Sequence, residues 1–318
     1  MTKVIVFGSI NMDLVTRSPR LPVAGETLLG HDFFTAAGGK GANQAVAVAR
    51  LGIPTQLVGR LGADNFGREL LANLQASGVD TGAVLVDEAA HSGVAAIAVG
   101  ARGENHIIIV PGANGRVKDE DVGRLSDLLP GAAALLLQFE IPMPAVVAAA
   151  RAARQAGVQV ILDPAPAIEM GDFASVLYPL VDIITPNEIE AGQLVGFAVD
   201  GQETAAKAAA ALRQRGVATA IVKLGDRGVF CATKEETFFV PAFPVQAVDT
   251  VAAGDAFNGG LAAALASRRT LREAVIWGAA AGAISATIAG AQPSLPDRET
   301  FNTFLRDRGI LSLTGTGE

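Results

Sequence analysis

One turn of this sequence, Ala252–Asp255, combines very small residues with a single carboxylate, a pattern suited to catalysis. Asp249–Gly259 reads DTVAAGDAFNG, and an alanine-rich helical pattern begins at about Ala252. A helix start without side chains offers unpaired N–H groups and the positive end of the helix dipole to an anion. Gly254 lets a ligand approach the main chain, and Asp255 projects into the same space. This arrangement suits a base that deprotonates a hydroxyl beside a developing phosphate charge, although an isolated A-G-D is more often an ordinary first turn.

A second glycine-rich stretch, Gly38–Gln44, reads GGKGANQ and precedes a helical pattern. It is not a Walker loop, because Gly41 stands where serine or threonine should follow the lysine. The paired glycines permit a ligand to approach the backbone closely, while Lys40 and Asn43 supply a cation and an amide. A glycine-rich turn of this kind is weak support for a binding site when taken alone.

The elements that must position these residues alternate between strands and helices. Short apolar runs at Val4–Phe7, Ala134–Phe139, Val158–Leu162 and Val181–Thr185 are each followed by polar residues. Repeated βα units of this kind predict a doubly wound parallel sheet whose ligands bind at the carboxyl ends of the strands. We expect that edge to carry Asn11, Asp13, Glu140, Asp163 and Asn187.

Two further segments, Leu14–Ala37 and His91–Val110, alternate apolar and polar residues and predict hairpins. An apolar run beginning at Val245 is strand-like and leads into Asp249. Asn187 and Glu190 have the spacing of a helix cap and its partner three residues on, which is the favoured interpretation of that pair alone.

Composition limits the classes of function. The chain has 318 residues, 50% of them hydrophobic, and a net charge of −7, which argues against a nucleic-acid or anionic-membrane partner. Cys231 is the only cysteine, so we expect no intrachain disulfide and a reducing cytoplasm. The first apolar run is too short for a signal peptide. Val275–Ala291 lacks charge but consists mostly of alanine and glycine, which predicts a buried helix rather than a membrane span.

Together, the two stretches resemble the signatures of the ribokinase family of ATP-dependent sugar kinases, and the resemblance runs from about Val4 to Pro296. The links GSINMD, LDPAPA, VDIITPNEIEA and GAQPSLP fit the ribokinase branch best. The resemblance implies one domain over residues 1–318, an α/β fold of the doubly wound αβα sandwich type. It also implies a small, discontinuous β-sheet lid from about 12–37 and 91–112, and a homodimer formed through the lids.

The implied reaction is transfer of a phosphoryl group from ATP to the 5-hydroxyl of D-ribose. By position, Asp255 would be the base, and the amides around Ala252, Ala253 and Gly254 would form the anion hole. The implied sugar-binding residues are Asn11, Asp13, Gly39, Lys40, Asn43, Glu140 and Asp255.

The resemblance also implies a nucleotide site and two cations. The ATP site would include Asn187, Glu190, Lys223, Leu224, Gly225, Asp226, Arg227, Gly228, Gly254 and Asp255, with Asn187 and Glu190 organising Mg²⁺ indirectly. Residues matching a K⁺ site, mostly through backbone carbonyls, are Asp249, Val251, Ser285, Ile288, Gly290 and Ser294. The Ala252-Ala253 pair departs from the wider family but is shared by the ribokinase branch.

Two alternatives remain open at this point. One is a kinase of the same family acting on deoxyribose, fructose or adenosine; Glu140 and Asn43 favour ribose over these. The other is a sugar-binding regulator that has lost catalysis. The intact Asp255, with Gly254 and the pair Asn187 and Glu190, argues against the regulator.

Overall fold

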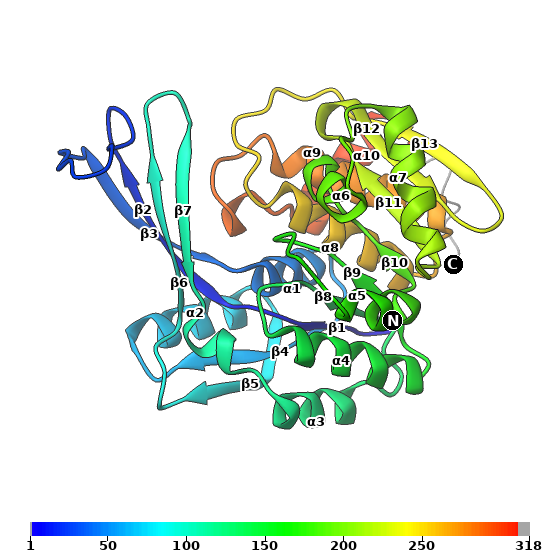
Figure 1. Cartoon of the computed structure of the whole chain (residues 1–318), viewed down its shortest axis with the longest axis horizontal. Helices are drawn as coiled ribbons and strands as arrows, with labels where there is room; N and C mark the ends of the chain where they lie inside the picture. Colours follow the sequence, from blue (N-terminus) through cyan, green and yellow to red (C-terminus); the bar gives the residue numbers. More distant parts are fainter. Residues whose placement is uncertain (1, 311–318) are drawn as a thin grey trace.

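The computed structural model describes residues 2–310, and within them the strands form two separate sheets. Figure 1 shows the larger sheet and its helices as the body of the molecule, with the smaller sheet extending away from it. This division matters for function, because the junction between the two sheets lies where the chain leaves its first strand.

The larger sheet has nine strands, in the order β13-β12-β11-β10-β9-β8-β1-β4-β5. Their bounds in that order are Thr237–Pro241, Gly228–Ala232, Thr219–Lys223, Ile183–Ile184, Gln159–Leu162, Ala134–Leu137, Val4–Phe7, Thr55–Gly62 and Val79–Asp87. The pairs from β5 to β11 are parallel, and β12 and β13 add an antiparallel edge. The chain winds from β1 towards β5 and then returns to wind from β8 towards β11. The point of reversal, between β1 and β8, is where a doubly wound sheet binds its ligand.

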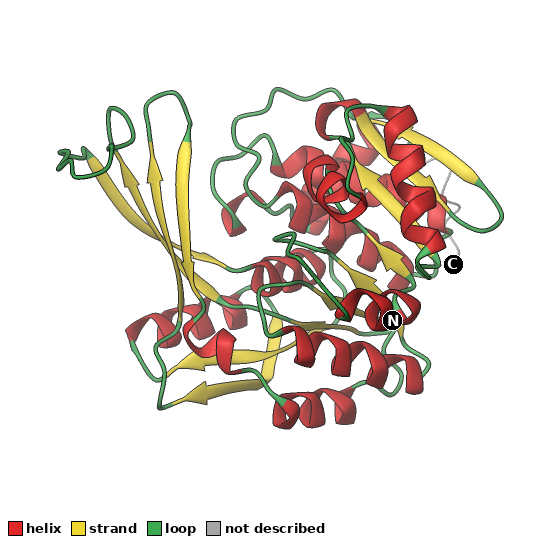
Figure 2. Ribbon diagram, viewed as in Figure 1, coloured by secondary structure: helices red, strands yellow, loops and turns green. Residues whose placement is uncertain are grey.

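Helices cover both faces of this sheet, giving three layers (Figure 2). Successive residues of a strand point to opposite faces, so Val4 and Val6 of β1 pack into one core cluster and Ile5 and Phe7 into the other. The first cluster contains residues of α1 Lys40–Arg50, α2 Asn65–Ala76, α8 Ala253–Ala266, α9 Leu271–Ser285 and α10 Arg298–Asp307. The second contains residues of α3 Asp119–Leu128, α4 Met143–Gln155, α5 Phe173–Leu177, α6 Glu188–Val195 and α7 Gln202–Gln214. The predicted αβα sandwich is thereby confirmed.

The smaller sheet has four strands in the order β3-β2-β6-β7, with bounds Asp32–Gly38, Asn11–Arg17, Gly93–Val99 and Asn105–Val110. Both predicted hairpins form, and β2 and β6 join them in parallel. A short 3₁₀ helix, η1 Gly112–Arg116, leads the chain back to the body. Every residue of β7 is exposed, so this sheet carries an uncovered edge strand.

One local expectation was wrong, and two details were not predicted. The run from Val245 is not a strand; it is an irregular segment in which the amides of Val248 and Asp249 both donate to the carbonyl of Ala286. Apolar alternation cannot reveal that no neighbouring strand is available for pairing. Strand β5 was not predicted, because Asp80, Thr81 and Gly82 interrupt its apolar pattern. The expected loop after α9 contains a 3₁₀ turn, η4 Gln292–Ser294; another two short turns are η2 Tyr178–Leu180 and η3 Gly225–Arg227.

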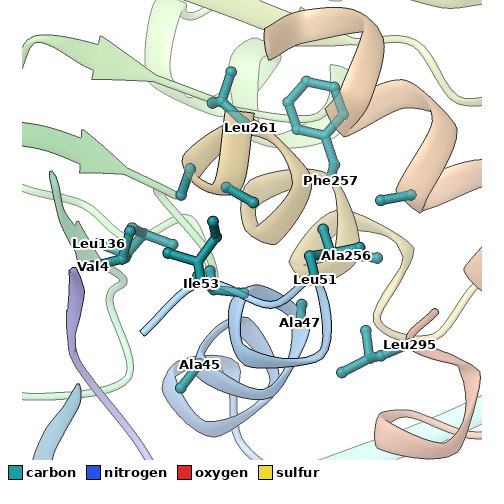
Figure 3. Close-up of a cluster of buried hydrophobic side chains, with 14 of the residues drawn as sticks. Val4, Ala45, Ala47, Leu51, Ile53, Leu136, Ala256, Phe257, Leu261 and Leu295 are labelled. Carbon is teal, nitrogen blue, oxygen red and sulfur yellow. The ribbon is translucent and has the colours of Figure 1, made fainter. Parts of the chain in front are cut away.

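Close packing between α1 and α8 aligns the starts of these two helices. A Cβ atom at Gly259 would lie 2.3 Å from the Cβ of Ala47, so the helices approach each other more closely than larger residues would allow. Figure 3 shows small side chains where the two helices meet, including Ala47 and Ala256. One turn earlier on each helix, Asn43 meets Asp255. The core therefore fixes the distance between the stretches Gly38–Gln44 and Asp249–Gly259, whose residue types are suited to chemistry.

Candidate active site

Asp255 is a buried carboxylate held by two side-chain amides from α1. Nδ2 of Asn43 donates to Asp255 Oδ2 at 2.9 Å, and Nε2 of Gln44 donates to Oδ1 at 3.0 Å. The side chain of Asp255 is 4% exposed. Burial raises the pKa of Asp255; Lys40 opposes this effect, the charge of Asp163 adds to it, and the two amides also favour the ionised form. A carboxylate with a raised pKa is a stronger base than an ordinary one.

Gln44 links Asp255 to a second carboxylate. Its Nε2 also donates to Asp163 Oδ2 at 3.0 Å, and Asp163 Oδ1 lies 3.3 Å from Nζ of Lys223. The sequence placed Asp163 at the ligand edge but assigned no role to Gln44. Consecutive residues of a helix point about 100° apart, so the position of Gln44 next to Asn43 did not indicate that both would bond Asp255.

The N-terminus of α8 forms a bare turn beside these carboxylates. Ala252, its N-cap residue, has φ 61 and ψ 4, a left-handed conformation that costs a residue with a Cβ atom about 1 kcal/mol or more. No side chain of the structure caps this helix start. A Cβ atom at Gly254 would lie 3.4 Å from Nζ of Lys223. The lysine therefore points at the turn, where an anion would meet both the cation and the helix dipole.

Glu140 lies across the site, after β8. Its Oε2 accepts from Ser9 Oγ at 2.5 Å and from the backbone N of Lys40 at 3.1 Å. The amide of Gly41 donates to the same serine oxygen at 3.4 Å. Ser9 thus ties the end of β1 to the start of α1, a role that the sequence did not indicate.

Asn11 and Asp13 begin β2, where the chain leaves the body for the smaller sheet. Asn11 Oδ1 accepts from Asn114 Nδ2 at 2.7 Å, and Asn114 also bonds both backbone polar groups of Ile10. Gly39 has φ 89, and a Cβ atom there would lie 2.7 Å from the backbone N of Asn11, so glycine is required for this close approach. A Cβ at Gly38 would lie 2.5 Å from Asp13 Oδ2.

Charges from separated parts of the chain influence one another here. Burial raises the pKa of Asp13 to about 7, and the charges of Glu140 and Asp255 contribute to the rise. Burial acts to lower the pKa of Lys40, but the surrounding carboxylates outweigh it and the pKa is raised, so Lys40 is a cation. The carboxylates acting on Lys40 are Asp255, Asp163, Glu140 and Glu190. The structure thus brings the predicted sugar-binding residues into one neighbourhood.

Asn187 and Glu190 form a reciprocal capping box at the start of α6. The amide of Glu190 donates to Asn187 Oδ1, and the amide of Asn187 donates to Glu190 Oε2, both at 2.8 Å. Burial raises the pKa of Glu190, with Asp163 adding to the rise and Lys223 opposing it. The pair therefore has the structural role that its spacing indicates, and its carboxylate also interacts with the charges of the site.

The predicted nucleotide segment continues from Lys223 into the 3₁₀ turn Gly225–Arg227. The side chain of Lys223 is 13% exposed and points inward, whereas Arg227 turns outward to Glu188 and to the carbonyl of Asp200. Gly228 then opens β12 with φ 121. The structure therefore brings Lys223 to the carboxylates and places Arg227 farther out, against α6.

The segments predicted to hold K⁺ lie side by side. Asp249 Oδ1 accepts from the amide of Val251 at 3.0 Å and Oδ2 accepts from the amide of Gly290 at 2.9 Å. The hydroxyls of Ser285 and Ser294 are 2.7 Å apart, and the amide of Ile288 donates to the carbonyl of Ser285.

Residues 2–310 contain no cluster of three or more His, Cys, Asp or Glu side chains arranged to hold a metal ion. None of their helices is both long and apolar enough to span a bilayer.

Known proteins resemble this chain over nearly its whole length. Residues 1–298 match the pfkB family of carbohydrate kinases. The chain is 41% identical over 300 residues to the ribokinase of Haemophilus influenzae, covering 94% of this chain and 97% of that one. It is 36% identical over 302 residues to the deoxyribokinase of Salmonella typhi, covering 95% and 98%. The solved structure of Arabidopsis thaliana ribokinase complexed with ribose and ATP superimposes with a TM-score of 0.87 at 34% identity, covering 96% of this chain and 99% of the other. The chain belongs to the pfkB family of carbohydrate kinases.

Proposed function

We propose that this protein transfers the γ-phosphoryl group of ATP to the 5-hydroxyl of D-ribose, giving ribose 5-phosphate. The observation that carries the proposal is the placement of Asp255 at the uncapped start of α8, held by Asn43 and Gln44, with Lys223 pointing at the same turn. A base and an anion site therefore lie within one helical turn. The relatives named ribokinase, at up to 41% identity, support ribose as the sugar.

In this mechanism, the chain's own residues contribute positioning and charge. Asp255 accepts the proton of the sugar hydroxyl as the hydroxyl oxygen attacks the γ-phosphorus atom, and the bond from that phosphorus to the bridging oxygen of ADP breaks, releasing ADP. The amides of the turn formed by Ala252, Ala253 and Gly254, together with Lys223, stabilise the charge on the transferring group. Little covalent chemistry is required, so the rate depends on holding the two substrates in line.

We assign sugar binding to the groups around the junction of β1 and β2. Asp13 and Glu140 offer carboxylate oxygens to hydroxyls, and Asn11, Asn43 and Lys40 offer donors. Gly39 leaves space for the sugar to approach the backbone. These residues come from the carboxyl ends of β1 and β8 and from the start of α1, which is the switch point of the sheet.

We assign the nucleotide to the other side of Asp255, along Lys223–Gly228 and the start of α6. The charge balance favours a divalent cation there, because the carboxylates Asp255, Asp163 and Glu190 outnumber the lysines Lys40 and Lys223. Oxygen ligands suit Mg²⁺, which supplies charge neutralisation to the phosphates. In this assignment Asn187 and Glu190 organise the ion indirectly, and Asp163 offers a further oxygen.

We propose K⁺ as a second cation, held between the segments around Asp249–Val251 and Ser285–Ser294. Support comes from their hydrogen bonds to each other and from hydroxyl and carbonyl oxygens as the donor set, which suits an alkali cation. The segment Asp249–Val251 lies directly before the anion-binding turn, so a cation bound to it would order Ala252–Gly254.

We propose that the smaller sheet is a lid and that two lids pair in a homodimer. The support is its separation from the body and the exposed apolar residues of β7, Ile107 and Ile108, which are 53% and 67% exposed. Closure over the sugar would exclude water, which otherwise competes for the phosphoryl group. We place the enzyme in the cytoplasm, in keeping with its free, buried Cys231.

An ADP-release assay over a panel of sugars and nucleosides tests the proposed function. D-Ribose should have the highest kcat/KM, with 2-deoxyribose weaker and with fructose and adenosine poor, because a site built for a hydroxyl discriminates against analogues that lack it. The deoxyribokinase relatives make 2-deoxyribose the most informative competitor. If 2-deoxyribose outranks ribose, the carbohydrate kinase assignment stands and the ribose assignment fails.

A further inference from the structure

Gln138 is a buried glutamine whose amide touches the catalytic neighbourhood only through another glutamine. It follows β8 and is 1% exposed. Its Nε2 donates to Gln44 Oε1 at 2.7 Å. Its own Oε1 has no hydrogen-bond partner within the described structure and is directed at Gly8, where a Cβ atom would lie only 2.0 Å away. A buried amide with one oxygen unsatisfied has a cost, typically about 1–3 kcal/mol, that calls for a function.

Gln44 can act correctly in only one orientation of its amide. Its Nε2 donates to both Asp255 Oδ1 and Asp163 Oδ2, each at 3.0 Å. An amide is nearly symmetrical in shape, so packing does not distinguish its nitrogen from its oxygen. If the amide turned over, Oε1 would face both carboxylates without a proton to share. The donor from Gln138 to Gln44 Oε1 opposes that reversal.

We propose that Gln138 is a positioning residue for the phosphoryl transfer: through Gln44, it keeps a hydrogen-bond donor directed at the base Asp255. This inference deepens the proposed function and rests on it. Among the described residues, Gln138 forms no hydrogen bond with Asp255 or with the anion-binding turn. Its effect is therefore transmitted through the orientation of the Gln44 amide. The relay crosses from the end of β8 to the first turns of α1 and then α8.

The proposal makes a prediction that depends on pH. Asp255 has one amide donor on each oxygen, and both favour its ionised form. The charged groups facing it from neighbouring elements are Lys40 of α1, Asp163 after β9, and Asp13 of β2, with Lys223 of β11 on the far side of Asp163. Loss of the Gln44 donor should therefore raise the pKa of Asp255 and move the acid limb of kcat to higher pH.

Gln138→Glu and Gln138→Met separate positioning from packing. In Gln138→Glu, the introduced carboxyl can donate to Gln44 when protonated, but when ionised it attracts the Nε2 of Gln44 and reverses the amide. The ratio of variant kcat to wild-type kcat should fall at least about tenfold from pH 6 to pH 9. Gln138→Met keeps the volume and removes the donor to Gln44, but it carries no charge that attracts the Nε2 of Gln44. Its ratio of kcat values should therefore not change with pH and should stay within about tenfold of unity. A Gln138→Glu ratio that is as flat as that of Gln138→Met would overturn the proposal.

A double-mutant cycle provides the second test and does not depend on Gln138→Glu folding. Gln44→Met should lower kcat and move the acid limb to higher pH, with smaller changes in the KM values for sugar and ATP. Adding Gln138→Met to Gln44→Met should cause no further loss, because Gln138 acts only through Gln44. Additive losses would overturn the proposal. All kcat values are measured with the sugar of the panel that the wild type phosphorylates fastest. If that sugar is not ribose, the proposed substrate is refuted and the test of Gln138 still applies.

Discussion

At the scale of single residues, the site holds its base with neutral donors rather than with a direct ion pair. Asp255 accepts from two amides, while the neighbouring cation Lys223 is bonded to Asp163 instead. Amide donors favour the ionised carboxylate, and burial opposes it, so the pKa stays raised. A direct ion pair with a lysine would lower the pKa of Asp255 and make it a weaker base. The arrangement therefore leaves Asp255 able to accept a proton.

Replacing the base tests this role. Asp255→Asn should lower kcat by roughly 10²–10⁴-fold, the range for loss of a general base. Folding should survive, because burial already disfavours the charge of Asp255 and asparagine carries none. We expect the melting temperature to be unchanged or higher, while ADP release nearly stops. Turnover close to that of the wild type in a purified, folded variant would remove Asp255 from the mechanism.

Asp13 should make both stability and sugar binding depend on pH. Its pKa is about 7 in the folded state, against 3.8 for the free group, so between these values the folded state binds the extra proton. Stability therefore falls as pH rises from about 4 to 7, and Asp13→Asn removes that loss. At pH 8, chemical denaturation should show the variant to be more stable, by at most about 4 kcal/mol.

The same substitution should weaken sugar binding, because an ionised carboxylate is a stronger acceptor for hydroxyls than an amide. The sugar KM of the wild type should fall from pH 6 to pH 8, and that of Asp13→Asn should change much less. Asp32→Asn, at an exposed site on β3, is the matched control and should leave the sugar KM unaltered. Equal pH profiles for Asp13→Asn and the wild type would contradict the assignment of Asp13 to the sugar.

At the scale of elements, the start of α8 shows how a helix can be locally strained and still useful. Its N-cap residue, Ala252, is left-handed, and the next residues carry no side chain large enough to fill the turn. Close contact of Gly259 with Ala47 holds the helix against α1. The element is thus placed by its buried half and leaves its first turn free for an anion.

Gly254→Ala should separate stability from activity. A Cβ atom there meets only Nζ of Lys223, at 3.4 Å, so the helix should tolerate it and gain up to about 1 kcal/mol. The methyl group would stand where the proposed phosphate meets the turn, so kcat should fall by roughly 10-fold or more. Gly123→Ala in α3, where a Cβ meets nothing within 4 Å, is the control: a similar gain in melting temperature with unchanged kcat. Unchanged kcat in both variants would exclude phosphate from this turn.

The two loop segments that precede α8 and follow α9 predict an effect of alkali cations. If K⁺ is bound near Asp249 and Ser294, activity should be higher in K⁺ than in Na⁺ or Li⁺, because oxygen cages select ions by size and field strength. Asp249→Asn should reduce this difference, since its carboxylate holds the amides of Val251 and Gly290 together. The measurement is the initial rate in carefully K⁺-free buffer against added chloride salts. Equal rates throughout would rule out the K⁺ site.

At the scale of the whole molecule, the smaller sheet is the part least explained by a single chain. Its outer strand β7 is exposed along its full length and ends in an apolar run, Ile107–Val110. An uncovered apolar edge favours association with another chain. Asn11 and Asp13 lie where this sheet leaves the body, so an interface between two such sheets would lie on the element that carries two of the residues proposed to bind the sugar.

Ile108→Lys should therefore weaken self-association. Ile108 is 67% exposed, so the single chain should fold normally with lysine there, whereas a paired edge would have to bury the charge. Light scattering after size exclusion should show a dimer for the wild type and a shift to monomer for the variant. Val176→Lys in α5 changes an apolar residue that is 41% exposed and lies outside the smaller sheet, and it should leave the mass unaltered. A monomeric wild type would refute the proposed homodimer.

The sequence alone was sufficient for the fold class and for most elements, and it also led to the proposal of Asp255 as the base. These depend on local patterns: apolar runs of strand length, helical periodicity, and glycines in the stretches around Gly38 and Gly254. Local patterns determine backbone preference and burial, which is why the αβα sandwich could be predicted. They failed where pairing decides the outcome, as in β5 and in the segment from Val245.

Only the tertiary structure decided which polar groups meet. Gln44 and Asp163 are 119 positions apart, and Gln44 and Asp255 are 211 apart, yet one amide bonds both carboxylates. The same holds for Ser9 with Glu140 and for Gln138 with Gln44. Hydrogen bonding depends on distances of about 3 Å and on direction, which no spacing along a chain specifies once several elements intervene. The close approach of α1 to α8, through Ala47 and Gly259, is what turns a list of suitable residues into a site.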